Sequence, residues 1–302
     1  MTATRTLAAP PLPAATARGI AMMLAAVVAF TVMDALAKAL IGRYDTVQVV
    51  WARYTVQTIG IALWQARRLG TVLRTAHPWL QVARSACQLG STAMFFAALR
   101  WIGLAEATAI ADLSPVLITL AAALVLREKI GPRRIAGVAA AFIGALIIIR
   151  PGSAVFTPAS LLPLGGALCY TGYAIITRRI GQAESVWTSL IYSTLIGAAM
   201  TTAALPTVWR PIAPGDLWLF AGIGLIGVVA QVFLIRAFTW AEASVVAPFG
   251  QTDLIFAALW GLIFFGDWPD GWTILGALVI AGAGLYVWHR ETRASRARQD
   301  AG

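Results

Sequence analysis

The sequence predicts an all-α membrane protein in which ten transmembrane helices form two inverted five-helix repeats. Three observations support this fold class: the apolar composition, the regular succession of long apolar runs, and a phrase that occurs in both halves. Of the 302 residues, 59% are hydrophobic and 12% are charged, whereas a soluble domain has about 25% charged residues. Because the chain lacks the polar surface of a soluble domain of its size, we predict that it lies in a membrane.

Each expected span is a mostly apolar run of about 20 residues, the length that crosses a bilayer. The run 135–149, IAGVAAAFIGALIII, contains no charged residue. The expected spans are 19–40, 46–66, 79–100, 103–126, 132–150, 160–178, 185–207, 215–236, 241–265 and 271–289. The loops between them are short and leave no room for a soluble domain.

The two ends of the chain differ from the spans in composition. We expect residues 1–18, rich in Ala, Pro and Thr, to be a disordered cytoplasmic segment, and residues 290–302 to be a basic cytoplasmic tail. The first apolar run is too long for a signal peptide and carries Asp34 and Lys38, so we expect it to be retained as a span. The spans then divide into the repeats 19–150 and 160–289.

The distribution of basic residues predicts the orientation. With a cytoplasmic N-terminus, most Lys and Arg residues fall on the inner side, and only Arg43, Arg100, Arg150 and Arg210 fall in outer loops. This is the positive-inside bias of multi-pass membrane proteins, and an even number of spans places both termini in the cytoplasm. The net charge of +10 therefore reports orientation, and we expect no nucleic-acid partner.

The repeated phrase is LAEATAIAD at 104–112 and WAEASVVAP at 240–248, an offset of 136 residues. Later in each half Gly137 corresponds to Gly276, an offset of 139, so we expect about three additional residues in the second copy near 249–253. An odd number of spans per copy inverts the second copy in the membrane. Inverted repeats are typical of secondary transporters, which bind substrate near the midplane between the repeats. The alternative is a duplicated channel or structural protein.

The chain resembles the drug/metabolite transporter superfamily in its ten-span branch with two EamA-type repeats. The resemblance lies in AEATAIADLSPVLITLAAALVLREKI (105–130), RIAGVAAAFIGALIIIRPG (134–152), AEASVVAPFGQTDLIFAALWGLIFFGDWP (241–269) and GALVIAGAGLYV (276–287). Glu128 matches the acidic residue that the family has after its fourth span, and Asp267 is a shorter counterpart after the ninth.

Within this superfamily the chain is most similar to bacterial exporters of aromatic amino acids. The resemblance implies a secondary transporter of the bacterial inner (plasma) membrane that exports small organic solutes by alternating access, as one repeat rocks against the other. The implied substrates are foremost aromatic or apolar amino acids. A monomer suffices for this mechanism, because one chain contains both repeats.

Charged residues in the first spans are candidates for a substrate cavity, because a charge at the bilayer centre costs roughly 2.5–3.5 kcal/mol on insertion scales. Asp34 and Lys38 share one helix face. They form either an internal pair, with Lys38 extending outward, or a cavity-facing pair for a zwitterion, or Asp34 is a proton site. We expect Arg53 to form a salt bridge with Asp34 rather than to contact substrate. We expect Arg84 to extend to the inner interface and Gln88 to reach the cavity.

The fourth and ninth expected spans are counterparts in the two repeats, and the ninth contains the most polar short stretch of any span. In the fourth span Asp112 and Ser114 precede Pro115, which frees a backbone carbonyl of the preceding turn. Freed backbone in a membrane lines a cavity or finds protein partners, so we expect this segment to line the cavity. The ninth span has Pro248, Gln251 and Asp253, and the two prolines place the two kinks at different depths. Three further candidates on neighbouring spans are Gln231, Tyr170 and Tyr173.

Other functions find less support in the sequence. We expect no metal site, cofactor or enzymatic activity, because the chain lacks a phosphate-binding loop, a metal-ligand cluster and a nucleophile motif. An exporter of cationic drugs would exchange a proton for a cation at Asp34 or Asp253. A carrier of phosphorylated sugars would need clustered basic residues, whereas Lys38, Arg53 and Arg84 lie at different depths. A non-transporting membrane protein is the remaining alternative.

Overall fold

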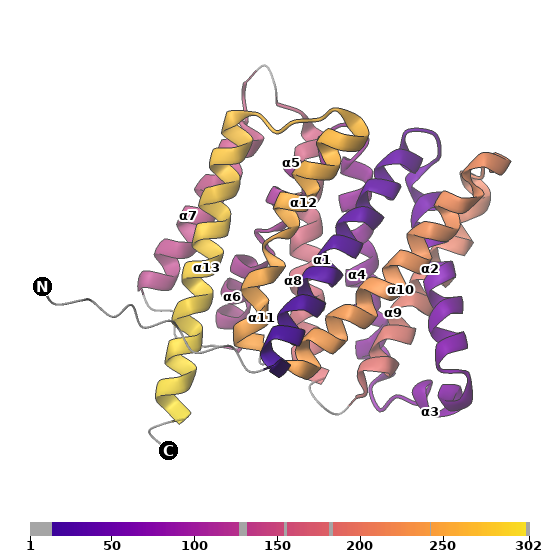
Figure 1. The fold of residues 1–302 in the computed structure, drawn as a ribbon, viewed down its shortest axis with the longest axis horizontal. Coiled ribbons are helices and arrows are strands. Elements are labelled where there is room, and N and C mark those ends of the chain that lie inside the picture. The colour runs from indigo at the N-terminus through magenta and orange to yellow at the C-terminus, as the bar shows by residue number, and fades with distance from the viewer. Residues whose placement is uncertain (1–13, 127–131, 154–155, 181–183, 242, 300–302) are drawn as a thin grey trace, which may run out of the picture.

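The structure is a computed structural model that describes residues 14–126, 132–153, 156–180, 184–241 and 243–299. The expected disordered segment therefore falls largely outside the described residues, as does Glu128. Within the described residues the chain consists of helices joined by turns and short loops (Figure 1). Each of the ten expected spans contains at least one helix.

The first half contains α1 (Ala14–Ile41), α2 (Thr46–Trp64), η1 (Ala66–Arg68), α3 (Leu69–Val72), α4 (Pro78–Ala98), α5 (Leu104–Ala111), α6 (Ser114–Leu126) and α7 (Pro132–Ile149). The second contains η2 (Pro158–Ser160), α8 (Leu161–Ile180), α9 (Val186–Ala204), η4 (Leu205–Thr207), η5 (Pro214–Asp216), α10 (Leu217–Trp240), α11 (Ala243–Gly250), α12 (Asp253–Trp260), η6 (Gly261–Phe265), a π-helical turn, and α13 (Gly271–Gln299). The last helix thus continues through most of the expected tail.

Six helical stretches of the described residues are long and apolar enough to cross a membrane. They are Ala15–Ile41, Leu104–Ala121, Pro158–Ile180, Val186–Thr207, Pro214–Trp240 and Pro248–Phe265. Two shorter apolar helices are Ile135–Ile149 and Gly271–Tyr286. The remaining two expected spans correspond to α2 and α4, which carry the buried polar residues Arg53, Gln57, Gln81 and Arg84 and are less apolar for that reason.

Both polar spans are broken helices, and their breaks lie at equivalent positions. Residues 112–113 separate α5 from α6, and residues 251–252 separate α11 from α12. The starts of α4, α5, α6 and α7 are each 139 residues before those of α10, α11, α12 and α13. The expected insertion near 249–253 is therefore wrong, because the phrase alignment that gave 136 residues does not match the helix starts. The expected difference in kink depth is also wrong. Pro115 follows its break and Pro248 precedes the other, so the breaks occupy equivalent positions although the prolines do not.

The first break is a consequence of Pro115, which has no N–H to donate to the carbonyl of Ala111. The hydroxyl of Ser114 donates to that carbonyl at 2.5 Å instead. At the second break the hydroxyl of Thr252 donates to the carbonyl of Phe249 at 2.7 Å. Side-chain hydroxyls thus satisfy carbonyl groups that the interrupted helices leave open, which a span within a membrane requires.

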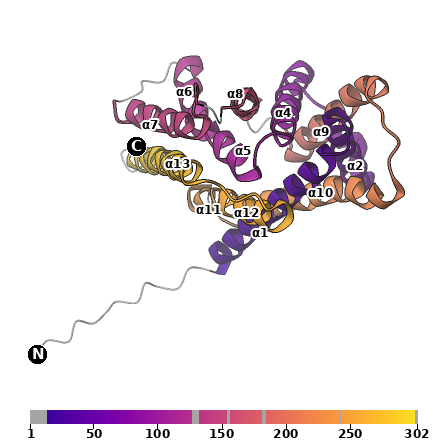
Figure 2. The ribbon, with the colours of Figure 1, turned by 90° about the horizontal axis from the view of Figure 1, so that it is seen from above.

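The helices of the two halves interlock. The most extensive packing joins α1 to α10, α4 to α8, α7 to α13 and α2 to α9, and each of these pairs contains one helix from either half. Exchanging the halves converts the α1–α10 pair into the α8–α4 pair and maps the other two pairs onto themselves. Seen from above, α4, α8 and α6 form one row and α1, α10, α12 and α11 another, with α7 and α13 at one end and α2 and α9 at the other (Figure 2). The fold is a duplicated arrangement.

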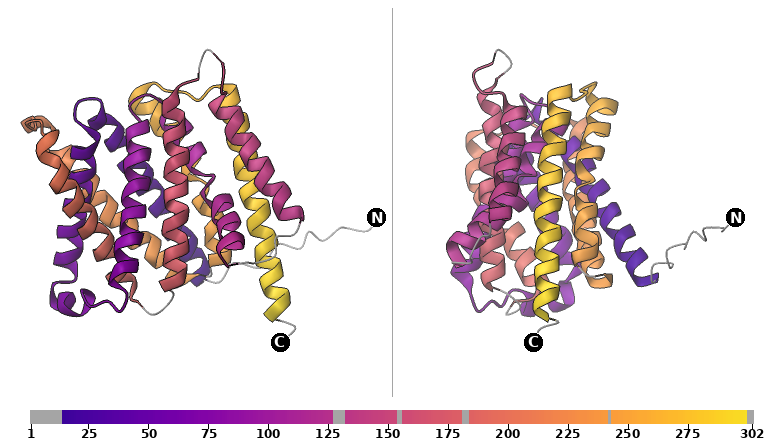
Figure 3. Two further views of the ribbon diagram at one scale, coloured as in Figure 1. Left: turned by 180° about the vertical axis from the view of Figure 1, so that it is seen from behind. Right: turned by 90° about the vertical axis from the view of Figure 1, so that its left-hand side faces the viewer.

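Small residues allow the close contacts between the halves, as the glycine-rich runs predict. A Cβ atom on Gly276 of α13 would lie 2.6 Å from the carbonyl oxygen of Gly144 on α7, so these two backbones touch. Figure 3 shows α7 and α13 side by side along their length. On α8, a Cβ on Gly166 would lie 3.2 Å from the carbonyl oxygen of Ser91 on α4. Helices in membranes associate through such faces, because lipid removes the hydrophobic driving force between them.

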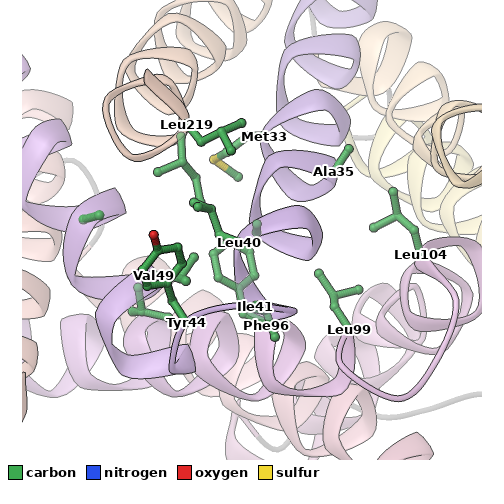
Figure 4. Packing of buried hydrophobic residues seen from close by; sticks show 14 of the residues in the cluster. Met33, Ala35, Leu40, Ile41, Tyr44, Val49, Phe96, Leu99, Leu104 and Leu219 are labelled. Atoms are coloured by element: carbon green, nitrogen blue, oxygen red, sulfur yellow. The ribbon is translucent and has the colours of Figure 1, made fainter. Parts of the chain in front are cut away.

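The largest group of buried apolar side chains joins α1, α2, α4 and α10 (Figure 4). Leu40 and Phe96 are fully buried there, and the ring of Tyr44 packs edge-on against Phe220 at a centroid distance of 4.9 Å. A second group joins α5 and α6 to α7 and α13. The broken helices contribute to both groups, with Leu104 and Ala257 in the first and Ile110 and Val116 in the second.

Candidate functional site

A cavity of about 420 Å³ lies between the two rows of helices. Its lining comes from both halves: α1, α2, α4, α5 and α6 of the first, and α8, α10 and α12 of the second. Both helix breaks reach it, through Asp112 and Ser114 at the first and Asp253 at the second. Its volume falls in the range of small-molecule sites, roughly 300–1,000 Å³.

Most of the residues predicted for a cavity line it. They are Asp34, Gln88, Asp112, Ser114, Pro115, Tyr170, Tyr173, Gln231 and Asp253. They come from six helices and the first break, yet the structure brings them to one space. The lining also includes apolar and hydroxyl side chains that the sequence analysis did not single out, among them Phe30, Phe95, Ser91 and Thr92. Such common residue types carry no signal of their own in a span.

Lys38 does not line this cavity. Its Nζ atom forms an ion pair with Asp267 Oδ2 at 2.6 Å and donates to the carbonyl of Ile102 at 3.0 Å. The two expected pairings of Lys38 with Asp34 are therefore wrong, whereas a proton site at Asp34 stays a prediction. One helical turn separates the residues by about 6 Å along the axis, so Lys38 reaches the loop after η6 while Asp34 stays level with the cavity.

Gln251 and Pro248 also fall outside the lining, although they lie close to Asp253. Pro248 is inside α11, and its carbonyl accepts from the backbone N–H of Gln251 at 3.3 Å. Gln251 lies in the break that follows α11, whereas Asp253 is the first residue of α12. Of the two, only Asp253 lines the cavity.

Arg53 of α2 lines the cavity instead of forming the expected salt bridge. Its charge is near enough to Asp34 to interact electrostatically, but the described residues contain no ion pair within 4.0 Å between them. The guanidinium lies 5.3 Å from the ring centroid of Phe96 and 5.7 Å from that of Tyr54. The position of Arg53 in the middle of its span indicates a role in the cavity. The expected salt bridge with Asp34 is wrong.

Arg84 is buried, which contradicts the expected extension to the interface. Its side chain is 2% exposed and donates to Thr177, Ser189, Ser193 and Tyr173 at 2.8 to 3.1 Å. The guanidinium also lies 4.6 Å from the Tyr173 ring centroid. These bonds join α4 to α8 and α9, and they fix the Tyr173 ring at the cavity wall.

The two predicted tyrosines form one wall of the cavity. The rings of Tyr170 and Tyr173 stack with centroids 5.4 Å apart and an interplanar angle of 29°. A flat ring can lie against such a surface, because stacked arrangements of aromatic rings are favourable by about 0.5–1.5 kcal/mol beyond the area they bury. The wall thus suits a molecule with a planar apolar part.

A second cavity, of about 340 Å³, lies near the loop between η6 and α13. This loop carries Asp267, paired with Lys38, and Asp270, whose carboxylate is 2.7 Å from Arg150. Burial acts to raise the pKa of Asp270, but the hydrogen bonds from Thr273 and the Arg150 guanidinium outweigh it and lower that pKa below its usual value. Both ion pairs join the first half to the second at this end of the bundle.

A multi-pass helical protein with a polar cavity between duplicated halves has the architecture of a solute carrier. The EamA-like transporter family matches the chain twice, over residues 17–150 and 157–288. The chain therefore belongs to the EamA-like transporter family, and it is not an enzyme.

Several characterised transporters are similar to the chain over most of its length. A riboflavin transporter of Rhizobium johnstonii is 34% identical over 238 residues, which is 76% of this chain and 77% of that protein. A pseudopaline exporter of Pseudomonas aeruginosa is 29% identical over 88% of this chain and 94% of its own. An S-adenosylmethionine uptake transporter of Rickettsia prowazekii is 23% identical over 93% of this chain and 96% of its own.

One crystal structure has the same fold, with a TM-score of 0.63 over 92% of this chain and 99% of that chain at 20% identity. That likeness concerns the fold; the family match and the relatives show that the chain belongs to a family of membrane transporters for small metabolites. The more specific prediction of an aromatic amino-acid exporter finds no support among these relatives, whose named substrates are of other kinds.

Proposed function

We propose that the chain is a secondary transporter that moves a small organic metabolite by alternating access, with ten spans in two inverted repeats. The observation that carries the proposal is the cavity at the two equivalent helix breaks, one from each half. Broken helices at a midplane site supply polar groups to substrate without exposing open backbone to lipid. A monomer in the bacterial inner membrane, with both termini in the cytoplasm, is sufficient.

The interlocked packing changes the motion that we propose. Because α1–α10 and α4–α8 join the halves so extensively, rocking one repeat as a unit against the other would break the largest contacts in the molecule. Whereas α11 and α12 pack against α1, and α12 also against α5, the helices α7 and α13 pack with α5 and α6 in a second group. We therefore propose that this group moves against the group of α1, α2, α4, α8, α9 and α10, with the cavity between them.

Counterflow in proteoliposomes tests the proposal. Vesicles loaded with unlabelled riboflavin, S-adenosylmethionine or tryptophan receive the corresponding labelled compound outside, without an imposed gradient. We expect accumulation of one of them, which an exchanging carrier produces and a channel does not. Asp253→Asn should abolish the accumulation and Gln251→Ala should preserve it, since only Asp253 lines the cavity. No exchange of any compound, or equal loss in both variants, would contradict the proposal.

The direction of transport and the coupling ion belong to the same proposal. The relatives include an exporter and an uptake transporter, and export remains our prediction for this chain. Export coupled to protons is the second candidate, because three carboxylates and a single guanidinium line the cavity. In inverted membrane vesicles, an imposed pH gradient should drive accumulation of the exchanged compound. Accumulation unaffected by the gradient would exclude proton coupling.

A further inference from the structure

The most unusual group in the cavity is Arg53, because its charge is buried without a hydrogen-bond acceptor. Its side chain is 8% exposed, and its Nε atom is fully buried with no partner among the described residues. The flanking rings of Tyr54 and Phe96 attract the cation by their faces, but they provide no acceptor for its N–H groups. A buried donor of this kind is ordinarily satisfied, so Arg53 indicates an acceptor that comes from outside the chain.

Gln88 on α4 is a buried acceptor that lacks a donor in the described part of the same cavity. Its Oε1 atom is buried and has no donor among the described residues. The side chain of an amide offers both an acceptor and two donors. Arg53 and Gln88 together can therefore bind a group that carries acceptor oxygens and, in addition, an N–H or O–H.

The opposite chemistry lies at the helix breaks. Asp112 follows α5 and Asp253 begins α12, so each half contributes one carboxylate, and the two are near enough to interact electrostatically. The Asp112 carboxylate has no hydrogen bond or ion pair among the described residues, and the Asp253 carboxylate accepts only from backbone N–H groups, its own and that of Leu254 at 2.8 Å. Two carboxylates facing one space repel each other unless one of them takes up a proton or a cation lies between them, and a ligand cation can replace that proton.

We infer that the cavity binds a dipolar organic molecule. Its acidic or carbonyl end lies at Arg53 and Gln88, its cationic or donor end lies at Asp112 and Asp253, and its planar part lies against Tyr170 and Tyr173. The inference rests on the proposed transport function for its biological meaning, but binding can be measured without transport. Asp34 interacts with Arg53 electrostatically but forms no ion pair with it within 4.0 Å. Specificity then comes from charge at both ends of the molecule, because each end disfavours a ligand that lacks the matching group.

Three compounds that share one ring test the inference. Tryptophan carries both charges, tryptamine lacks the carboxylate, and indole-3-propionate lacks the ammonium. Binding to the purified full chain in detergent is measured by isothermal titration calorimetry. We expect tryptophan to bind at least tenfold more tightly than either analogue. Equal binding of tryptamine and tryptophan would overturn the role of Arg53, and no binding of any of the three would overturn the assignment of a ring-bearing dipolar ligand.

Variants assign each end of the ligand. In Arg53→Gln, tryptophan should bind no more tightly than tryptamine, whereas Arg53→Lys should keep part of the preference. In Asp112→Asn, tryptophan should bind no more tightly than indole-3-propionate. The reverse pattern, or a uniform loss for all three compounds in a folded variant, would contradict the assignment. Charge-selective binding without counterflow would refute the proposed transport and leave the dipolar ligand standing. Counterflow without charge-selective binding would refute the dipolar ligand and leave the transport standing.

Discussion

The ion pair between Lys38 and Asp267 allows a prediction that depends on its asymmetric burial. The Lys38 side chain is 12% exposed, whereas that of Asp267 is 43% exposed. Removing the carboxylate leaves a mostly buried ammonium with one remaining acceptor, the carbonyl of Ile102 at 3.0 Å. Removing the ammonium leaves a carboxylate that water can solvate. The two substitutions should therefore have unequal effects on the free energy of unfolding, although they break the same bond.

The magnitudes follow from the two environments. Asp267→Ala should destabilise the protein by about 2–3 kcal/mol, because breaking a buried charged hydrogen bond leaves the donor unsatisfied. Lys38→Met conserves the volume and leaves an exposed partner, so it should cost about 1 kcal/mol or less. The double variant should resemble Lys38→Met, because the stranded ammonium is gone. The effects of the two substitutions on the free energy of unfolding should therefore not be additive.

Unfolding by denaturant in detergent measures the change in the free energy of unfolding for the two single variants and the double variant. Thermal melting of the same variants is a second measurement. A protein of this size should lose about 2–4 °C per kcal/mol, so Asp267→Ala should melt well below Lys38→Met. Asp267→Asn is a matched control that retains an acceptor oxygen for Lys38, and it should fall between them. Equal losses for the two single variants, or a double variant equal to their sum, would refute the reasoning from burial.

Three further predictions concern packing, pH and the cavity wall. Gly276→Ala should destabilise by about 1–3 kcal/mol, because its Cβ would meet the facing carbonyl on α7 at 2.6 Å, whereas Gly282→Ala, with nothing within 4 Å, should be neutral or stabilising in the same melting experiment. The folded-state pKa of Asp270 is lowered, so its contribution to the free energy of unfolding is complete above the unfolded-state pKa and disappears as pH falls through the folded-state pKa. The melting temperatures of wild type and Asp270→Asn should therefore converge between pH 7 and pH 3. A constant difference between them would contradict this. Tyr173→Phe removes one acceptor of Arg84 and should cost about 1 kcal/mol in denaturant unfolding, and an unchanged midpoint would show that the bond contributes nothing.

The sequence predicted the cavity better than it predicted individual contacts. Polar residues within apolar spans must face the protein interior, and this rule alone placed Asp34, Asp112 and Asp253 near one another. Hydropathy likewise located the helices, since span length is set by the bilayer. These predictions depend on each span's own composition and hold without knowledge of the neighbouring helices.

Several of the predictions that failed depended on a contact with another helix or on local register. Lys38 binds Asp267, which is 229 residues away in sequence, and no local spacing indicates such a contact. Arg84 is buried because α8 and α9 supply its acceptors. Gln251 was included because it lies beside Asp253, whereas the register at the helix break decides which of them faces inward. The ten-span topology, the inversion and the orientation of the termini remain predictions.

The interlocked halves have a consequence for biosynthesis. The first helix, α1, packs chiefly against α10, which is synthesised roughly 180 residues later, or about 10–35 s at typical elongation rates. During that interval the face of α1 that packs against α10 has no final partner, and the emerging chain must be held at the insertion site or in loose contact with its neighbours. A ribosome that stalls after the first half would release helices with unmatched faces, which cellular proteases recognise. The duplication that builds the cavity thus makes assembly depend on the last helices to emerge.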